Sequence, residues 1–381
     1  MIQITIDTET ASQRLDKFLR RYLPEAGSGF LYKQLRKKNI TLNGAKASGK
    51  ELLREGDEIR IFFSDETLRK FSAAGPLPQK NKPEKPGPAP LAASDILFED
   101  SHVLILNKKA GILSQKAAPE DISLVEMIQS YLTEKGELTE ESLRIFRPSV
   151  VNRIDRNTSG IVLAAKTLAA ARELSECLRD RTVHKYYYAL TEGEIREPAR
   201  ISAYLTKDPR TNRVTIHDRA SVRTSVADAV PSRTSAASIP DNVQIPDAKL
   251  AFAAEGVQNP GEYIETEYSP VKHFRITDPH GQPASFTLLK VNLITGKTHQ
   301  IRSHLSFIGH PIIGDVKYGL RNRNEDFRKH FGLRRQFLHA SELVFPPMNG
   351  VLSDLSGRTF LAPLPDDLRT TLKKLEAANR L

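Results

Sequence analysis

Cysteine is nearly absent from this chain of 381 residues, in which Cys177 is the only one. A single cysteine excludes an internal disulfide, and it excludes a zinc site built from several thiolates. In the segment LAAARELSECLRD, Leu174 and Leu178 fall on the same helical face as Cys177. We therefore expect Cys177 to be a packed thiol, because nothing near it in the sequence favours a reactive thiolate.

The sequence also lacks a long apolar segment, a lipidation motif and the hydrophobic region of a signal peptide. These absences predict a soluble, cytoplasmic protein without a membrane partner. Acidic residues are in the minority, since 46 Asp and Glu stand against 56 Lys and Arg and leave a net charge of +10. This excess of positive charge favours a polyanionic partner, and nucleic acid is the leading candidate.

The chain is longer than a usual single domain, so two domains are expected, and residues 1–64 are predicted to form a small one. Apolar residues alternate at its start and then recur at helical spacing in QRLDKFLRRYL and FLYKQLRKKNITLNG, before a strand-like DEIRIFF. Asn43 and Gly44 between them indicate a turn. The outer face of the second helix would carry Lys33, Arg36, Lys37 and Lys38. Such a face predicts phosphate contacts, although a merely solvated charged face has the same pattern.

This arrangement of residues 1–64 resembles the alpha-L RNA-binding motif, a helix pair with strands that occurs in several RNA-modifying enzymes. Residues 65–94 contain six prolines among interspersed lysines, which predicts an extended linker. Residues 95–381 are expected to form the larger domain, which opens with a β-hairpin in DILFEDSHVLILNKK. Within it, residues 216–261 are rich in Ala, Ser and Pro, so we expect a poorly ordered insertion there.

The segment NRIDRNTSG, residues 152–160, places one acid, Asp155, between Arg153 and Arg156. Guanidinium groups stay protonated at ordinary pH, so an acid between them remains ionised and can approach an anionic polymer. A carboxylate in such a basic setting is a candidate nucleophile. Taken alone, the pattern is more typical of surface ion pairs ahead of a strand, here the apolar run 161–165, than of catalysis.

Two further segments have informative patterns. In HKYYYALTEG, alternation predicts a strand with Tyr187 on the face opposite Tyr186 and Tyr188, although three tyrosines in a strand also simply pack well. In LITGKTHQIRSHLSFIGHPIIGDVKYG, the apolar spacing predicts an amphipathic helix that carries Arg302. The glycines of this segment fit neither phosphate-binding fingerprint, and we interpret them as turns.

Together the three segments resemble the RluA family of RNA pseudouridine synthases, whose catalytic signature commonly reads HRLDRDTSG. The resemblance implies that Asp155 is the catalytic carboxylate, that Tyr187 lies against the target base, and that Arg302 forms an ion pair with Asp155. The further residues expected to contact RNA are Arg153, Arg156, Lys297 and His299. The chain departs from the family pattern at Asn152, where histidine is usual, and at Lys109, where proline is usual, but neither change removes the acid.

The same resemblance implies an α+β fold. It predicts a small N-terminal alpha-L RNA-binding module and a larger pseudouridine synthase domain, built on a mixed, mainly antiparallel β-sheet with flanking helices and a central RNA-binding cleft. The implied activity isomerises uridine to pseudouridine in structured RNA, with 23S ribosomal RNA or a ribosomal precursor as the expected partner. No cofactor is expected, because the isomerisation leaves atom count and oxidation state unchanged.

Three alternatives remain open at the level of the sequence. Transfer RNA is the second candidate substrate. A catalytically silent RNA-binding protein of ribosome assembly is disfavoured, because it would have no need of all three implied catalytic residues. A metal hydrolase would have to use His299, His304, His310 and Asp315. Because His299 and His304 are five residues apart and would point in different directions on a helix, we predict no metal site.

Overall fold

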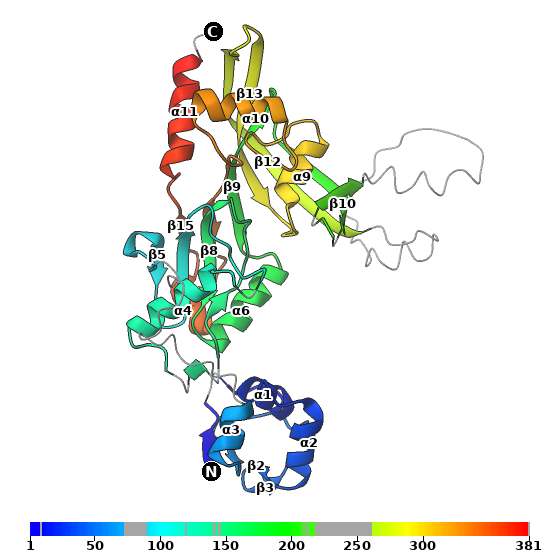
Figure 1. Ribbon diagram of the computed structural model, residues 1–381, viewed down its shortest axis with the longest axis vertical. Coiled ribbons are helices and arrows are strands. Elements are labelled where there is room, and N and C mark those ends of the chain that lie inside the picture. The colour runs from blue at the N-terminus through cyan, green and yellow to red at the C-terminus, as the bar shows by residue number, and fades with distance from the viewer. Residues whose placement is uncertain are drawn as a thin grey trace, which may run out of the picture. The chain divides into compact units, whose positions relative to one another are not determined.

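The computed structural model of the protein describes residues 1–7, 10–71, 90–118, 120–139, 142–143, 146–208, 210–211, 213–217 and 261–379 (Figure 1). The chain divides into two compact units, and each is described by itself. Unit 1 comprises Met1–Arg156, Ile161–Thr182 and Phe345–Arg358, and unit 2 comprises Asn157–Gly160, Val183–Val344 and Thr359–Leu381. Asp155 therefore belongs to unit 1, whereas Tyr187 and Arg302 belong to unit 2.

The N-terminal part of unit 1 forms an antiparallel sheet of strand order β1-β4-β2-β3 together with helices. Its elements are β1 (Ile2–Thr5), α1 (Leu15–Tyr22), α2 (Ser28–Arg36), β2 (Ile40–Leu42), β3 (Ala45–Lys46), β4 (Glu58–Ile61) and α3 (Asp65–Phe71). Asn43 and Gly44 both adopt positive φ angles, of 50° and 72°, between β2 and β3. This backbone suits an Asn-Gly hairpin turn, so the predicted turn is confirmed.

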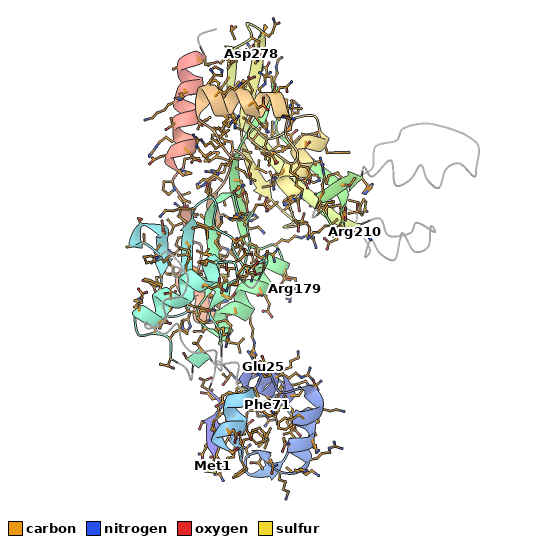
Figure 2. All side chains as sticks on the ribbon, viewed as in Figure 1. Met1, Glu25, Phe71, Arg179, Arg210 and Asp278 are labelled. Atoms are coloured by element: carbon orange, nitrogen blue, oxygen red, sulfur yellow. The ribbon has the colours of Figure 1, made fainter. Side chains whose placement is uncertain are left out.

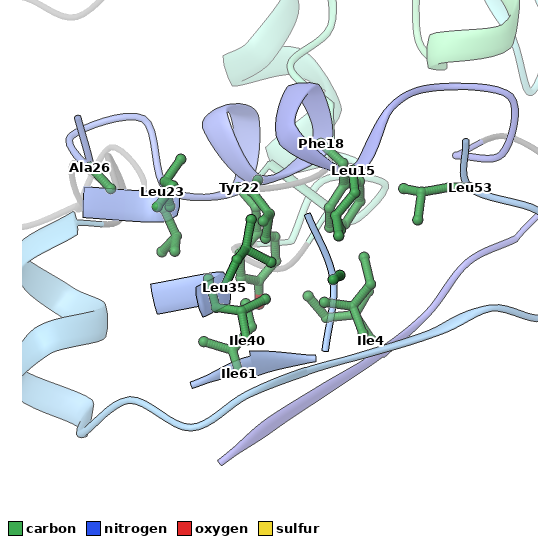
Figure 3. Close-up of a cluster of buried hydrophobic side chains, with 14 of the residues drawn as sticks. Ile4, Leu15, Phe18, Tyr22, Leu23, Ala26, Leu35, Ile40, Leu53 and Ile61 are labelled. Carbon is green, nitrogen blue, oxygen red and sulfur yellow. The ribbon is translucent and has the colours of Figure 1, made fainter. Parts of the chain in front are cut away.

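The helical spacing of apolar residues in α1 builds the core of this part (Figure 3). Leu15, Phe18, Leu19 and Tyr22 all turn inward and are at most 3% exposed. They pack with buried residues of α2 and the sheet, including Leu35. Each large apolar side chain buried in this way contributes roughly 1.5–3 kcal/mol, which is enough to hold a small module together.

Helix α3 lies inside the range predicted as a linker. Its Leu68 is buried in the core of the N-terminal part, and the ring of Phe71 lies 4.4 Å from that of Phe30. The backbone N–H of Glu25 donates to the carbonyl oxygen of Phe71 at 3.2 Å (Figure 2). The module thus extends through Phe71, because the proline-rich composition starts only after this helix; residues 72–89 of the predicted linker lie outside the described residues.

The remainder of unit 1 opens with the predicted hairpin. Its elements are η1 (Ala93–Asp95), β5 (Ile96–Glu99), β6 (Val103–Lys108), α4 (Leu124–Glu134), β7 (Ser149–Val150), β8 (Ser159–Ala165), α6 (Leu168–Arg179) and η3 (Gly350–Leu355). The Asp100 carboxylate closes the β5–β6 turn by accepting the N–H groups of His102 and Val103 at 2.7 and 2.6 Å. On α6, Leu174 is fully buried and Cys177 half-buried, with its Sγ 3.8 Å from Met348 Sδ.

Unit 2 contains a larger set of long strands. Its elements are β9 (His184–Glu192), β10 (Ala199–Asp208), β11 (Arg213–His217), β12 (Glu262–Thr277), β13 (Pro283–Leu293), α9 (Gln300–Phe307), α10 (Arg321–Asp326), η2 (Phe327–Phe331), β14 (Leu338–Val344), β15 (Thr359–Leu361) and α11 (Asp366–Ala378). The strand order is β11-β10-β12-β13-β9-β14 with antiparallel pairing, and β14 pairs in parallel with Ser159 and Gly160 at the start of β8. This mixed, mainly antiparallel sheet confirms the predicted sheet type.

Helices α9 and α11 pack against β12, which gives the sheet the flanking helices that the sequence predicts. The predicted insertion at 216–261 begins within β11. The last residue of this strand, His217, forms a hydrogen bond between its Nε2 and Thr206 Oγ1 at 2.8 Å. Residues 218–260 lie outside the described residues. Within the described part of the chain, no helix is both long enough and apolar enough to span a membrane.

Candidate active site

Asp155 lies in a loop between β7 and β8 whose backbone is fixed on its N-terminal side. The side-chain Oδ1 of Asn152 accepts the N–H of Leu163 in β8 at 2.7 Å. Ser114 Oγ donates to the carbonyl oxygen of Ile154 at 2.9 Å and accepts the N–H of the same residue at 3.2 Å. These bonds hold the residues before Asp155, whose own side chain is half-buried. Asn152, where the family usually has histidine, thus has a structural role in this chain.

On the C-terminal side of Asp155 the loop is held by Lys108, which sequence reasoning did not assign. Lys108 is 2% exposed, and its ammonium donates to the carbonyl oxygens of Lys109, Ile112 and Arg156 at 3.0, 2.8 and 3.2 Å. The N–H of Gly111 donates to the Arg156 carbonyl as well, at 2.8 Å. A buried ammonium needs such acceptors. In the sequence, the position of Lys108 at the end of an apolar strand could have indicated that this lysine is buried and binds such acceptors.

Arg153 and Arg156, predicted to contact RNA, are both exposed. Arg156 Nε donates to the Gly111 carbonyl at 3.0 Å, and Arg153 Nη1 lies 3.4 Å from Gln115 Oε1. The two arginines flank Asp155 in the sequence, and their exposure makes them accessible to a polyanion. Contact with RNA stays a prediction for both.

Tyr187 lies on β9, and the predicted alternation of this strand is confirmed. Lys185, Tyr187 and Ala189 are at most 9% exposed, whereas Tyr186 and Tyr188 are half-buried on the other face. Tyr187 is held between Val291 on β13 and Ala340 on β14, its partners in the two adjacent strands. Its backbone position is thus rigid, and its role toward a base stays a prediction.

Arg302 is buried on α9 and forms a two-pronged ion pair with Asp315. Its Nε and Nη2 lie 2.6 and 2.8 Å from the two carboxylate oxygens, and its guanidinium lies 5.2 Å from the ring centroid of Tyr318. Burial raises the pKa of Asp315, but the hydrogen bonds and charge of Arg302, together with the N–H groups of Lys317 and Tyr318, outweigh it and lower that pKa. The carboxylate is therefore charged. The contact between Arg302 and Asp155 stays a prediction.

The turn that carries Asp315, the partner of Arg302, depends on glycine. Gly314 has a φ of +80°, and a Cβ atom there would lie 2.0 Å from the carbonyl oxygen of Arg335. A Cβ atom on Gly319 would lie 2.3 Å from the carbonyl oxygen of Asp315. The predicted role of these glycines as turn residues is confirmed.

The four residues of the rival metal interpretation each have a different partner. His299 Nδ1 lies 3.0 Å from Tyr318 Oη, His304 Nδ1 lies 2.8 Å from Thr266 Oγ1, and His310 Nδ1 lies 2.9 Å from the Glu192 carbonyl oxygen. Burial lowers the pKa of His304 to about 4. Among the residues that the structure describes, no group of three or more His, Cys, Asp or Glu could hold a metal ion.

A second buried arginine, Arg335, holds the residues that follow the Asp155 loop. Its Nε and Nη2 pair with the Asp367 carboxylate at 2.7 and 3.1 Å. Its Nη1 donates to the Asn157 carbonyl oxygen at 3.1 Å, and its Nη2 donates to Ser159 Oγ at 3.2 Å. Sequence reasoning missed this residue, because its partners are far away along the chain and no local pattern joins them.

His339 also holds Ser159, which Arg335 contacts. Its Nε2 lies 3.1 Å from the Ala362 carbonyl oxygen, which can only accept, so Nε2 carries the proton and Nδ1 accepts from Ser159 Oγ at 2.9 Å. Burial lowers the pKa of His339 to about 4, and the nearby charge of Arg335 acts in the same direction. The imidazole is therefore neutral at physiological pH.

The other predicted RNA contacts are exposed except for His299. Lys33, Arg36, Lys37 and Lys38 are all exposed at the end of α2, as the sequence predicts. Lys297 pairs with Glu262, at 2.5 Å, and His299 is half-buried at the start of α9 with a left-handed φ of 54°. The geometry leaves the α2 cations accessible to a polyanion.

The sequence model of a family described as RNA pseudouridylate synthase matches residues 102–307, just over half of the chain. Among curated proteins, the ribosomal large subunit pseudouridine synthase C of Vibrio cholerae is 29% identical over 355 residues, covering 90% of this chain and 88% of its own length. The protein of the same name from Escherichia coli strain K12 is 28% identical over 383 residues, covering 98% of this chain and 97% of its own.

Among solved structures, the human RNA pseudouridylate synthase domain containing 4 protein is similar with a TM-score of 0.50 and 20% sequence identity. The match covers 74% of this chain and 92% of that chain. It supports the fold.

Proposed function

Because the chain belongs to the RNA pseudouridylate synthase family, we propose that it isomerises uridines of 23S ribosomal RNA and that Asp155 is the catalytic carboxylate. One observation carries the proposal. The matched range 102–307 contains Asp155, Tyr187 and Arg302, the three residues to which the resemblance gives roles. The curated relatives named as ribosomal large subunit enzymes support the choice of RNA, and we accordingly expect the protein to act in the cytoplasm.

The reaction breaks the bond between N1 of uracil and C1′ of ribose and forms a bond between C5 and C1′. C5 loses a proton and N1 gains one, so atoms and electrons balance without a cofactor. Asp155 would either attack the sugar or remove a proton from it while the detached uracil remains enclosed. Both routes need an anionic carboxylate held in a fixed direction. The hydrogen bonds on both sides of Asp155 hold its backbone in a fixed position.

Arg302 would keep the Asp155 carboxylate charged and aimed. A guanidinium is planar and stays charged, and Asp315 holds that of Arg302 at Nε and Nη2. The fixed positive charge of Arg302 would favour the ionised form of a carboxylate placed near it. Tyr187, rigid within the sheet, would stack on the detached uracil ring.

The target uridine has to leave its stack before the glycosidic bond is accessible, which costs a few kcal/mol. Arg153 and Arg156 are the proposed residues that occupy or brace the vacated space, since both are exposed and flank Asp155. Lys297 and His299 would contact the RNA backbone. The α2 cations would add phosphate contacts as part of an alpha-L module, which gives salt-sensitive affinity without sequence reading.

The test is to delete the gene, map pseudouridines across cellular RNA, and restore the strain with wild-type protein or with Asp155→Asn. We expect pseudouridines of 23S ribosomal RNA to disappear, the wild-type protein to restore them, and the variant to bind RNA without restoring them. Asp180→Asn is the control, because Asp180 is an exposed aspartate at the end of α6, and it should restore every position.

The outcomes separate the parts of the proposal. Pseudouridines lost from transfer RNA instead would overturn the substrate. Restoration by Asp155→Asn would overturn the role of the carboxylate while leaving the substrate in place.

A further inference from the structure

Unit 2 contains a cavity of about 380 Å³ that none of the proposed catalytic residues lines. Its wall is formed by the turn after Asp315, by α10 and η2, and by the segment that follows them. The residues that matter for its chemistry are Val316, Arg321, Asn324, Glu325, Arg328 and Arg334. Pockets that bind small ligands have volumes of roughly 300–1,000 Å³, so the cavity has room for one compact ligand.

The floor of the cavity is built rigidly by Asn324. Its Oδ1 accepts the N–H of Gly314 at 2.7 Å, and its Nδ2 donates to the carbonyl oxygen of Asp315 at 2.8 Å. The N–H of Gly319 donates to the same carbonyl oxygen at 2.9 Å. The side-chain amide thus fixes the turn against α10.

The charge around the cavity is positive. Three arginines line it against one carboxylate, Glu325, and that carboxylate forms an exposed ion pair with Arg321 at 3.2 Å. Arg328 and Arg334 are both exposed. Guanidinium groups bind phosphate in a two-pronged geometry, so a ligand with a phosphate group fits this lining best.

The rim of the cavity is apolar. Val316 is 85% exposed and Leu320, next to the lining residue Gly319, is 51% exposed. These exposed aliphatic side chains offer apolar contact to a base or a ribose. A phosphate-binding wall next to an apolar rim matches the two chemical parts of a nucleotide.

We propose that this cavity binds one nucleotide of the substrate RNA outside the target uridine, with its phosphate on Arg328 and Arg334 and its base or sugar on Val316. The proposal rests on the proposed function in one respect, because it takes RNA as the substrate. Val316 directly follows Asp315, which holds Arg302, so an RNA strand seated here would contact the turn that positions the proposed catalytic arginine. The cavity would therefore anchor the strand beside the site.

The test measures binding of a labelled single-stranded oligouridylate of 12 nucleotides to the full chain as a function of salt. Asp155→Asn is used as the background, so that the RNA is not modified during the titration. For single strands, each lost phosphate contact lowers the slope of log K against log salt by about 0.7. We expect Arg328→Gln with Arg334→Gln, which together lose one phosphate, to flatten the slope by about 0.7 and to weaken binding at low salt.

Lys329→Gln is the matched control. Lys329 is an exposed cation beside Arg328 on η2, but it does not line the cavity, so removal of its charge should leave the slope within about 0.3 of the reference, less than one contact. Glu325→Gln should tighten binding, because it removes the carboxylate that faces the phosphate and releases Arg321. A gain in this variant and a loss in the double variant together are the pattern expected if the charge around the cavity controls binding.

A double variant whose slope equals that of the control would overturn the proposal. A double variant that keeps the oligonucleotide slope but loses binding of uridine 5′-monophosphate would overturn it too, because the cavity would then hold a free mononucleotide. Failure of the proposed function is a separate result. It would appear as wild-type protein that forms no pseudouridine while the arginine variants still change the slope.

Discussion

Two buried arginines in unit 2 form similar ion pairs in different surroundings. Arg302 and Arg335 are 6% and 9% exposed, and each holds both oxygens of an aspartate. The Asp315 side chain is fully buried, whereas the Asp367 side chain is 43% exposed. If Asp367 is removed, water can hydrogen-bond to Arg335 in its place, whereas water has no access to the buried Asp315. Arg302 therefore depends on its carboxylate partner more strongly than Arg335 does.

The two arginines also differ in the group on which they are expected to act. Arg335 directs Nη1 to a backbone carbonyl, that of Asn157, and so fastens the segment directly after the Asp155 loop. Arg302 is proposed to act on the Asp155 carboxylate itself. One arginine would therefore act on the reacting group, and the other acts on the backbone that carries it.

The largest expected difference concerns stability. Asp315→Ala leaves the Arg302 guanidinium buried without its carboxylate, which should cost about 3–5 kcal/mol of unfolding free energy. Asp367→Ala removes a half-exposed partner and should cost about 1 kcal/mol or less. Chemical denaturation of both variants measures the two losses. Equal losses would show that the exposure of Asp367 does not distinguish the pairs.

The next effect is pH dependence, because each region contains a buried neutral histidine, His304 near Arg302 and His339 near Arg335. Their pKa values in the folded state are about 4, below the ordinary value of 6.5. The unfolded chain therefore takes up these protons first as the pH falls. The stabilising contribution is complete above pH 6.5 and is lost between pH 6.5 and 4, by at most about 3 kcal/mol for each histidine.

Unfolding free energies measured from pH 7 to pH 4 check this expectation in wild-type protein, His304→Gln and His339→Gln. Each variant should lose less stability over that range than the wild type. A variant whose pH profile runs parallel to that of the wild type would show that its histidine is not kept neutral by burial.

The smallest expected effect separates the two arginines in catalysis. Arg302→Lys should lower kcat about 10–100-fold, because an ammonium cannot reproduce the fork and loses charged hydrogen bonds of about 1.5–3 kcal/mol. Arg335→Lys should lower kcat less than tenfold and leave KM for RNA unchanged, since it acts through the backbone. Single-turnover and steady-state kinetics on the same RNA distinguish these results. A wild-type rate in Arg302→Lys would remove Arg302 from the reaction.

Much of the fold could be predicted from local patterns. The hairpin of β5 and β6, the alternation along β9 and the helix that carries Arg302 all follow from the spacing of apolar residues. Helix α3 was missed, because the prolines farther along dominated the composition of its segment. The helix is held by Leu68 and Phe71, whose contacts are with distant parts of the chain.

The site could be predicted less completely. Family resemblance identified Arg302, but its partner Asp315 was considered only as a metal ligand, because a distance along the sequence does not reveal which acid a buried arginine faces. Arg335 and Asp367 are joined only by the tertiary fold. Lys108 was the one anchor with a local signal, since a lysine at an inward position of an apolar strand requires acceptors.

Lys108 and Arg335 hold the chain directly after Asp155 through main-chain carbonyl oxygens, those of Arg156 and Asn157. Any amino acid except one that distorts the backbone presents the same oxygen. A mutagenesis library can therefore vary the side chain at position 157 without removing the hydrogen bond that holds the loop of the proposed catalytic carboxylate.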